Sequence, residues 1–126
     1  MAKNRVYPQG KIFKAGVPVG TVSGSPVLVG ASLTGVALID RQADGTATIQ
    51  RNGAYDLTVK AIDGVGSNAV VEGDQIYYVL ADTPPLSKKA TGVPFGKAIL
   101  NPFRADAAGA TLLVAGATGI VTLDQN

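Results

Sequence analysis

Residues 44–59 read DGTATIQRNGAYDLTV, and this stretch decides the class of fold that we expect. Asp44-Gly45 and Asn52-Gly53 are typical of tight turns, because both kinds of dipeptide tolerate a positive φ. Between them, residues 46–51 alternate in character, as a β-strand with one buried face does. The stretch therefore predicts a β-meander that runs through both turns.

The same signature extends along the whole chain. Sixteen Gly and seven Pro interrupt the 126 residues at short intervals and leave no long window for a helix. The runs between them are β-branched and aliphatic, which indicates strands. We expect an all-β fold, a small single-domain barrel or tulip of short antiparallel strands with long loops, formed by residues 11–126 behind a flexible arm of residues 1–10. The predicted strands are 11–13, 26–29, 35–39, 46–51, 54–59, 75–80, 96–100, 110–114 and 120–123.

Two segments are predicted to be loops. Residues 84–92, PPLSKKATG, are polar and open with two prolines, so we expect them to project into solvent. Residues 101–109 contain Pro102 and end in Gly109, and they form the second loop.

Two stretches of the chain resemble each other. Residues 23–39 contain a glycine turn, the apolar run SPVLV and then GVALI, and residues 72–100 repeat this order with EGDQIYYV and GKAIL. Each copy is typical of a hairpin. Because a lone hairpin cannot bury its apolar face, we expect each copy to need the other.

Composition excludes several kinds of chemistry. The chain contains no His and no Cys, which removes the commonest general base, the commonest metal ligand and every thiolate site. The net charge is +2 and is unevenly placed: residues 1–39 carry four basic and no acidic side chains, and the remainder carries seven basic and nine acidic ones. A basic leading segment indicates an acidic partner surface or a solvated tail.

The carboxylates have a structural interpretation. Asp40 with Asp44, and Glu72 with Asp74, are pairs that could bind calcium or act as acid and base. Neither pair has the spacing of a calcium loop, and Asp in turns ordinarily accepts hydrogen bonds from nearby backbone. We therefore expect turn chemistry at both pairs.

Other candidate motifs are also interpreted as structural. Gly64-Val-Gly66 and the 116–119 segment lack the Lys-Ser/Thr ending or the following helix of phosphate-binding loops, and turns or bulges are expected there. Ser87 beside Lys88 lacks the buried, strained setting that a Ser–Lys nucleophile needs. We predict no catalytic residue, no metal site and no cofactor.

Neither nucleic acid nor a membrane is an expected partner. Tyr77-Tyr78 is the only aromatic pair, and neighbouring strand residues face opposite sides, so the pair makes no stacking platform. The most apolar segment, residues 112–123, is shorter than the roughly 18–20 residues that span a bilayer. Pro8 and Lys11 interrupt any secretory leader, so synthesis without export is expected.

Several stretches together resemble the small capsid decoration (cement) proteins of tailed bacteriophages. They are MAKN at the start, SGSPVLVG at 23–30, GVALI at 35–39, VVEGDQIYY at 70–78, ATG at 90–92 and GKA at 96–98. The resemblance covers most of residues 1–100 and continues loosely into the AGATLLV run at 108–114. Residues 101–104 and 116–126 depart from the compact ending that is usual in that family.

The resemblance implies a non-catalytic structural protein. It would be made in the host cytoplasm, bind the major capsid protein on the outer face of the virion and stabilise the head as a homotrimer. We expect the basic, aromatic and proline-containing leading arm to lie across the capsid or a neighbouring subunit, since Arg and Tyr are common interface anchors. The candidate interface residues are Lys3, Arg5, Val6, Tyr7, Pro8 and Gln9. Two alternatives stay open: a carbohydrate or host-surface binding module displayed on a virion, and a tail or baseplate component.

Overall fold

The structure, a computed structural model, describes residues 12–30, 33–51, 53–101 and 111–125. These residues form strands and turns and no helix, which confirms the all-β class. The strands are β1 (Ile12–Gly16), β2 (Pro26–Val29), β3 (Leu33–Ala37), β4 (Thr46–Gln50), β5 (Ala54–Lys60), β6 (Val70–Val71), β7 (Gln75–Tyr78), β8 (Leu86–Ser87), β9 (Val93–Ile99), β10 (Thr111–Leu113) and β11 (Thr118–Asp124).

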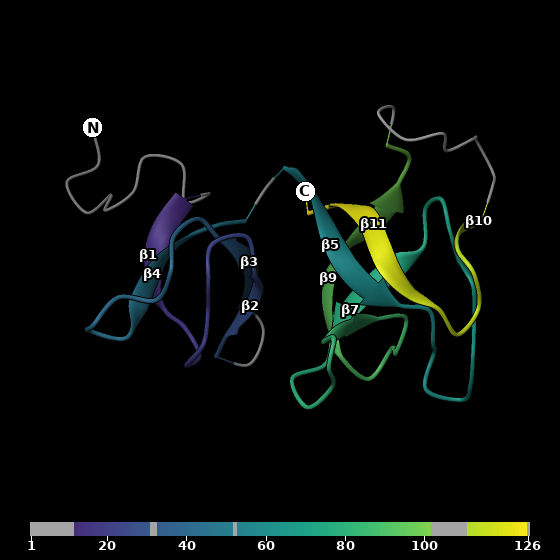
Figure 1. The fold of residues 1–126 in the computed structure, drawn as a ribbon, viewed down its shortest axis with the longest axis horizontal. Helices are drawn as coiled ribbons and strands as arrows, with labels where there is room; N and C mark the ends of the chain where they lie inside the picture. Colours follow the sequence, from purple (N-terminus) through teal and green to yellow (C-terminus); the bar gives the residue numbers. More distant parts are fainter. Residues whose placement is uncertain (1–11, 31–32, 52, 102–110, 126) are drawn as a thin grey trace, which may run out of the picture.

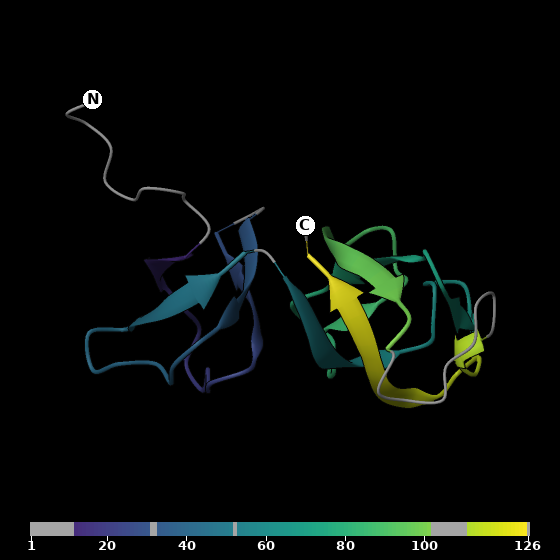
Figure 2. The same ribbon diagram turned by 90° about the horizontal axis from the view of Figure 1, so that it is seen from above.

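The strands form two groups that lie side by side (Figures 1 and 2). The first is a four-stranded antiparallel sheet with the order β1-β4-β3-β2. The second is a closed barrel with the order β11-β5-β8-β7-β9, and a short β10-β6 pair lies beside it. We call these groups the N-terminal sheet and the C-terminal barrel.

The meander predicted across Asn52-Gly53 is wrong. β4 pairs with β1 and β3 in the N-terminal sheet, whereas β5 pairs with β11 and β8 in the barrel. Both edges of each strand are therefore occupied by other partners, and β4 and β5 do not pair as a hairpin. Gly53 has a φ of 102°, which a side chain would strain, and its carbonyl accepts a hydrogen bond from the Gln125 N–H.

The loop predicted at residues 84–92 is also wrong in its middle part. Leu86 and Ser87 form β8, which pairs in parallel with β5 and antiparallel with β7 and so closes the barrel. Leu86 has no exposed surface and Ser87 is almost fully buried. The two prolines before Leu86 allow only a short strand, because a proline has no N–H to donate. The predicted loop at 101–109 lies outside the described residues except for Asn101.

The sheet and the barrel repeat one arrangement, which extends the internal resemblance seen in the sequence. Without β8, the barrel order is β5-β11-β9-β7, which corresponds strand for strand to β1-β4-β3-β2. The two copies also share a pair of backbone hydrogen bonds. In the sheet, Gly24 N donates to Ala37 O and Ala37 N donates to Ser25 O. In the barrel, Gly73 N donates to Ala98 O and Ala98 N donates to Asp74 O. The predicted pair of hairpins is therefore part of a four-stranded repeat.

The apolar side chains follow the same repeat. The ladder registers align eight apolar positions: Phe13 with Tyr55, Ala15 with Leu57, Val17 with Val59, Val27 with Ile76, Val29 with Tyr78, Ala37 with Ala98, Ala47 with Val121, and Ile49 with Leu123. In the sheet these residues form a small cluster, and in the barrel they belong to the larger core. Val36 and Leu28 point the other way and pack against the barrel core, which joins the two groups.

Candidate interaction surfaces

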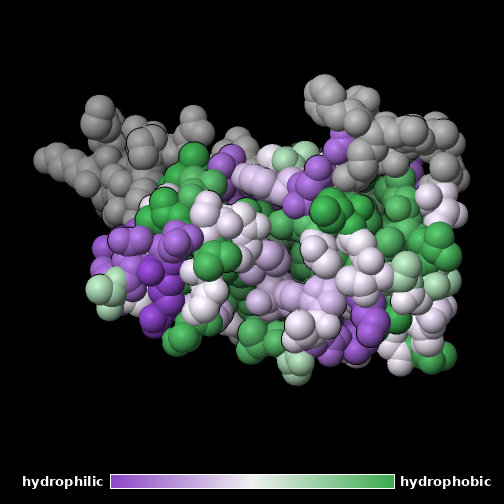
Figure 3. Space-filling model, in the orientation of Figure 1, coloured by the Kyte–Doolittle hydropathy of each residue, from purple (hydrophilic) through white to green (hydrophobic). Residues whose placement is uncertain are grey.

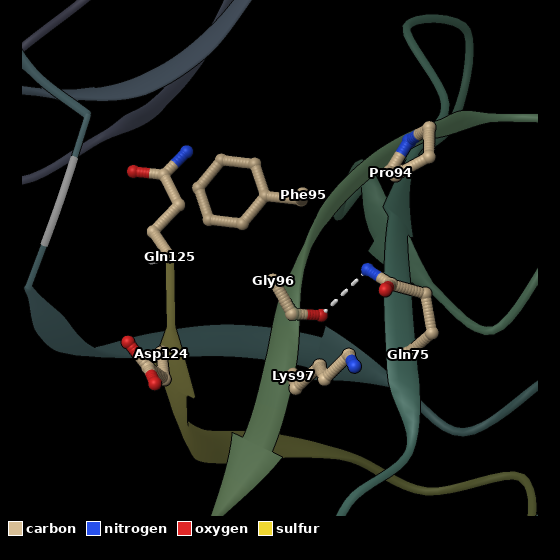
Figure 4. A pocket seen from close by; sticks show the side chains of 7 residues that line it. All are labelled: Gln75, Pro94, Phe95, Gly96, Lys97, Asp124 and Gln125. Atoms are coloured by element: carbon tan, nitrogen blue, oxygen red, sulfur yellow. Dashed lines mark hydrogen bonds between the residues drawn. The ribbon is translucent and has the colours of Figure 1, made fainter.

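A cavity lies where the barrel meets the N-terminal sheet. It has a volume of about 380 Å³ and is lined by Gln75, Pro94, Phe95, Gly96, Lys97, Asp124 and Gln125. These residues come from β7, β9 and the end of β11 (Figure 4). β9 bulges at this point, because Ile76 pairs with Gly96 while Tyr77 pairs with Pro94, leaving Phe95 as the extra residue.

One amide side chain at this cavity joins two barrel strands, and another joins the barrel to the N-terminal sheet. The Gln75 Nε2 donates to the Gly96 carbonyl at 2.9 Å, and the Gln125 Nε2 donates to the Thr34 hydroxyl at 3.2 Å. Gln125 is buried, and its Oε1 has no hydrogen-bond partner among the described residues. The lining residues include no hydroxyl, thiol or imidazole group.

Asp44 and Asp74 hold turns, as predicted from the sequence, whereas Asp40 bonds a segment 17 residues away. Asp40 accepts a hydrogen bond from the Ser23 N–H at 2.8 Å, and Asp74 accepts one from the Val71 N–H at 2.8 Å. Asp44 accepts from both the hydroxyl and the N–H of Thr46, and these bonds together with the Lys14 ammonium lower its pKa to about 2. Within the described part of the chain, no group of three or more acidic, His or Cys side chains is placed to hold a metal ion.

Asp63, which the sequence did not single out, stabilises the turn at 63–66 through the hydrogen bonds that it accepts. Asp63 accepts hydrogen bonds from Asn68 Nδ2 at 2.8 Å and from the N–H groups of Gly66 and Val65 at 3.0 Å each. The Asn68 bond, followed by the two backbone bonds, lowers the pKa of Asp63 to about 2. The spacing Asp-Gly-x-Gly was a usable signal, because Asp commonly accepts from the N–H two residues later. The predicted turn at Gly64-Val-Gly66 is confirmed.

The Ser87–Lys88 pair is not a nucleophile and its base. The Lys88 ammonium donates to Asn68 Oδ1 and to the Ala69 carbonyl, each at 2.9 Å, and lies 2.9 Å from the Asp74 carboxylate. All three of its donors are therefore directed at oxygen acceptors away from β8. Lys88 is a structural cation that ties β8 to the segment before β7.

Exposed aliphatic side chains stand at the turns of both groups. Val65 is 98% exposed at the tip of the turn that Asp63 holds, and Val19 is 85% exposed in the N-terminal sheet. Leu80 and Val114 are also largely exposed. Hydrophobic residues are scattered over the face seen in Figure 3, and several lie along its lower edge.

The predicted interface residues Lys3, Arg5, Val6, Tyr7, Pro8 and Gln9 lie outside the described residues. No helix in the described part of the chain has the length and apolar character needed to cross a membrane. Tyr78 is buried in the barrel core and Tyr77 is half-buried, as expected for neighbours in a strand.

Comparison with protein families gives one match. The sequence profile of the phage cement protein family matches residues 9–116, which covers the N-terminal sheet and the barrel up to the turn before β11. No curated protein and no solved structure matches the chain. The family is a structural one associated with the phage capsid, in agreement with the resemblance seen in the sequence. With most of its length matched by this profile, the chain belongs to the phage cement protein family.

Proposed function

We propose that this protein is a non-catalytic cement protein that binds the outer surface of a tailed-phage capsid and stabilises the head. The family match over residues 9–116 carries the proposal. The partner is the major capsid protein, and the protein acts as a homotrimer after synthesis in the host cytoplasm. The absence of His and Cys from the whole sequence agrees with a role that depends on contact area.

The fold supports a mechanism based on several weak contacts. The sheet and the barrel are locked together through Val36, Thr34 and Gln125, so we treat residues 11–126 as one domain that presents its turns in a fixed arrangement. The exposed aliphatic tips at Val19 and Val65 each add a small apolar contact with the capsid. In a trimer these contacts act together through effective concentration, which makes a decorated lattice hard to dismantle.

The leading arm remains the proposed capsid or subunit interface. It combines the positive charges of Lys3 and Arg5 with the aromatic ring of Tyr7, directly before β1. Arg and Tyr contribute strongly at interfaces because they combine a large contact area with hydrogen-bonding groups.

The test mixes purified protein with undecorated heads and measures co-sedimentation. We expect the intact chain to bind at saturable stoichiometry and to raise the temperature at which the heads release their DNA. A variant lacking residues 2–10 is expected to keep its far-UV circular dichroism and lose most of its binding. Failure of the intact chain to bind heads, or binding to glycans or to tail structures instead, contradicts the proposal.

A further inference from the structure

Among the described residues, the N-terminal sheet has no counterpart of β8, the strand that closes its repeat, the C-terminal barrel. In the barrel, β8 fills the space between β5 and β7 and closes the ring. The corresponding strands of the sheet are β1 and β2, and no described residue pairs with their outer edges. The chain is also shorter here, since residues 30–32 connect β2 to β3 whereas residues 79–92 connect β7 to β9. We call the open line between β1 and β2 the seam.

Some apolar residues beside the seam are less buried than their counterparts in the barrel. Val59 and Tyr78 pair with Leu86 of β8 and are buried, at 0% and 7% exposure. Of their counterparts in the sheet, Val17 is also buried, whereas Val29 is half-buried. Ala15, the counterpart of the buried Leu57, is half-buried as well. Positions farther from the seam show no such difference, since Ile49 and Leu123 are both fully buried. Beside Ala15 and Val29, the core of the sheet is therefore less enclosed than the core of the barrel is beside β8.

Backbone groups at the seam are directed outward. Ala37 N donates to Ser25 O, so the hydrogen bonds of the β2–β3 ladder fall at alternate residues and the N–H and C=O of Leu28 face the open edge. Val17 N donates to Gly45 O, which leaves the polar groups of Gly16 facing the same line from β1. A Cβ added at Gly16 would meet no atom within 4 Å. The seam thus offers both apolar and hydrogen-bonding groups to an added strand.

We propose that the seam binds the leading arm of a second copy of this chain, with Val6 in the place that Leu86 takes in the barrel. This inference rests on the proposed function, which supplies the trimer, and it names a contact that would hold the copies together. β8 runs parallel to β5, so a strand seated in the seam runs parallel to β1. A parallel neighbour in the same chain needs a crossover of a dozen or more residues, and only residues 7–11 separate Val6 from β1. The strand therefore comes from another copy.

The sequence of the arm suits this site. Val6 is the only aliphatic residue between Lys3 and Gln9, so only one register places an apolar side chain inward. Arg5 and Tyr7 then face outward, and Pro8 limits the strand to a short length, as the prolines before Leu86 limit β8. Each copy donates its arm to the next, a head-to-tail contact that closes into a ring when the rotation allows.

Disulfide trapping tests the proposal directly, because the chain has no cysteine of its own. The Tyr78–Leu86 pair of the barrel predicts that Val6 lies opposite Val29. Mixing Val6→Cys with Val29→Cys under mild oxidation is expected to give mostly the mixed disulfide. The matched control pairs Val6→Cys with Val65→Cys, whose side chain is fully exposed far along the chain from the seam. Equal yields in the two mixtures would overturn the proposal.

A doubly substituted chain separates exchange between copies from folding back within one copy. Val6→Cys/Val29→Cys is expected to form disulfide-linked oligomers. A disulfide closed within a monomer, with a yield independent of protein concentration, would show that the arm fills the seam of its own chain and would overturn the exchange.

Substitution of the seated residue provides a second readout. Val6→Asp is expected to reduce the oligomer to monomer in light scattering, because a carboxylate would enter an apolar site, whereas Val6→Ile is expected to leave its mass unchanged. Unaltered mass in Val6→Asp would count against the proposal. Binding to heads is measured separately. Formation of the mixed disulfide without binding to heads would contradict the cement function but not the arm exchange. Binding to heads without the mixed disulfide would contradict the arm exchange but not the cement function.

Discussion

The Lys88 ammonium lies 2.9 Å from the Asp74 carboxylate, and this pair joins the strand that closes the barrel to the turn that opens β7. Both side chains are mostly buried, and the same carboxylate oxygen accepts the Val71 N–H. The pair therefore holds β8 in place from the side opposite β5. Hydrogen bonds to charged groups stabilise more than neutral ones when solvent is largely excluded.

We expect Lys88→Met to destabilise the barrel by about 1–3 kcal/mol, because the oxygens of Asp74 and Asn68 lose a charged donor while remaining mostly buried. The measurement is the free energy of unfolding in urea. Lys97→Met is the matched control, since Lys97 is exposed on β9, and it is expected to change stability by less than about 0.5 kcal/mol. Similar losses in the two variants would contradict the structural role of Lys88.

Truncation of Leu86 tests whether β8 is part of the core. Leu86→Ala is expected to cost about 2–5 kcal/mol, because the side chain is fully buried and its removal leaves a cavity. Leu80→Ala changes the same kind of residue a few positions earlier, where the side chain is mostly exposed, and is expected to be nearly neutral. The measurement is the thermal unfolding of both variants. If Leu86→Ala is as stable as the wild type, residues 84–92 form a solvent-exposed loop and β8 is not part of the core.

Gly96 is expected to tolerate no side chain. A Cβ at this position would lie 2.7 Å from the Asp124 carbonyl oxygen on β11, and backbone on both strands would have to shift. Gly96→Ala should therefore destabilise by about 1–3 kcal/mol. Gly16→Ala, where a Cβ meets nothing, serves as the control. The measurement is the midpoint of unfolding in urea. Equal midpoints for the two variants would contradict the close approach of Gly96 to Asp124.

Acid should weaken two turns in a predictable range. The pKa values of Asp44 and Asp63 are lowered from 3.8 to about 2 by the hydrogen bonds that they accept. A lowered folded-state pKa means that the stabilisation is present above pH 3.8 and is lost as the pH falls toward 2. Asp63→Asn should flatten the dependence of the urea midpoint on pH over this range, and Asp44→Asn should do so independently. A pH dependence that is the same in the wild type and the double variant would contradict these assignments.

Local sequence was sufficient for most strands and for the repeat. Residues 56–60 alternate between polar and apolar side chains, and the segments around Val27 and Val121 contain short aliphatic runs next to glycine turns. Their strand character therefore depends on nearby residues alone. The pairs Gly24–Ala37 and Gly73–Ala98 recur because the same short motif produces the same hairpin twice. Several boundaries shifted by a few residues, since β3 begins at Leu33 and β9 begins at Val93.

Strand partners were decided only by tertiary structure. The sequence between Thr46 and Lys60 does not reveal that β4 and β5 pair with different neighbours. The edges of both strands are paired with strands that lie far away in the sequence. Leu86 follows two prolines in a polar stretch and is buried only because the barrel needs a fifth strand there. Composition and local pattern thus determined an all-β chain without His or Cys, while long-range competition for strand edges determined which half closed into a barrel and which half stayed a sheet.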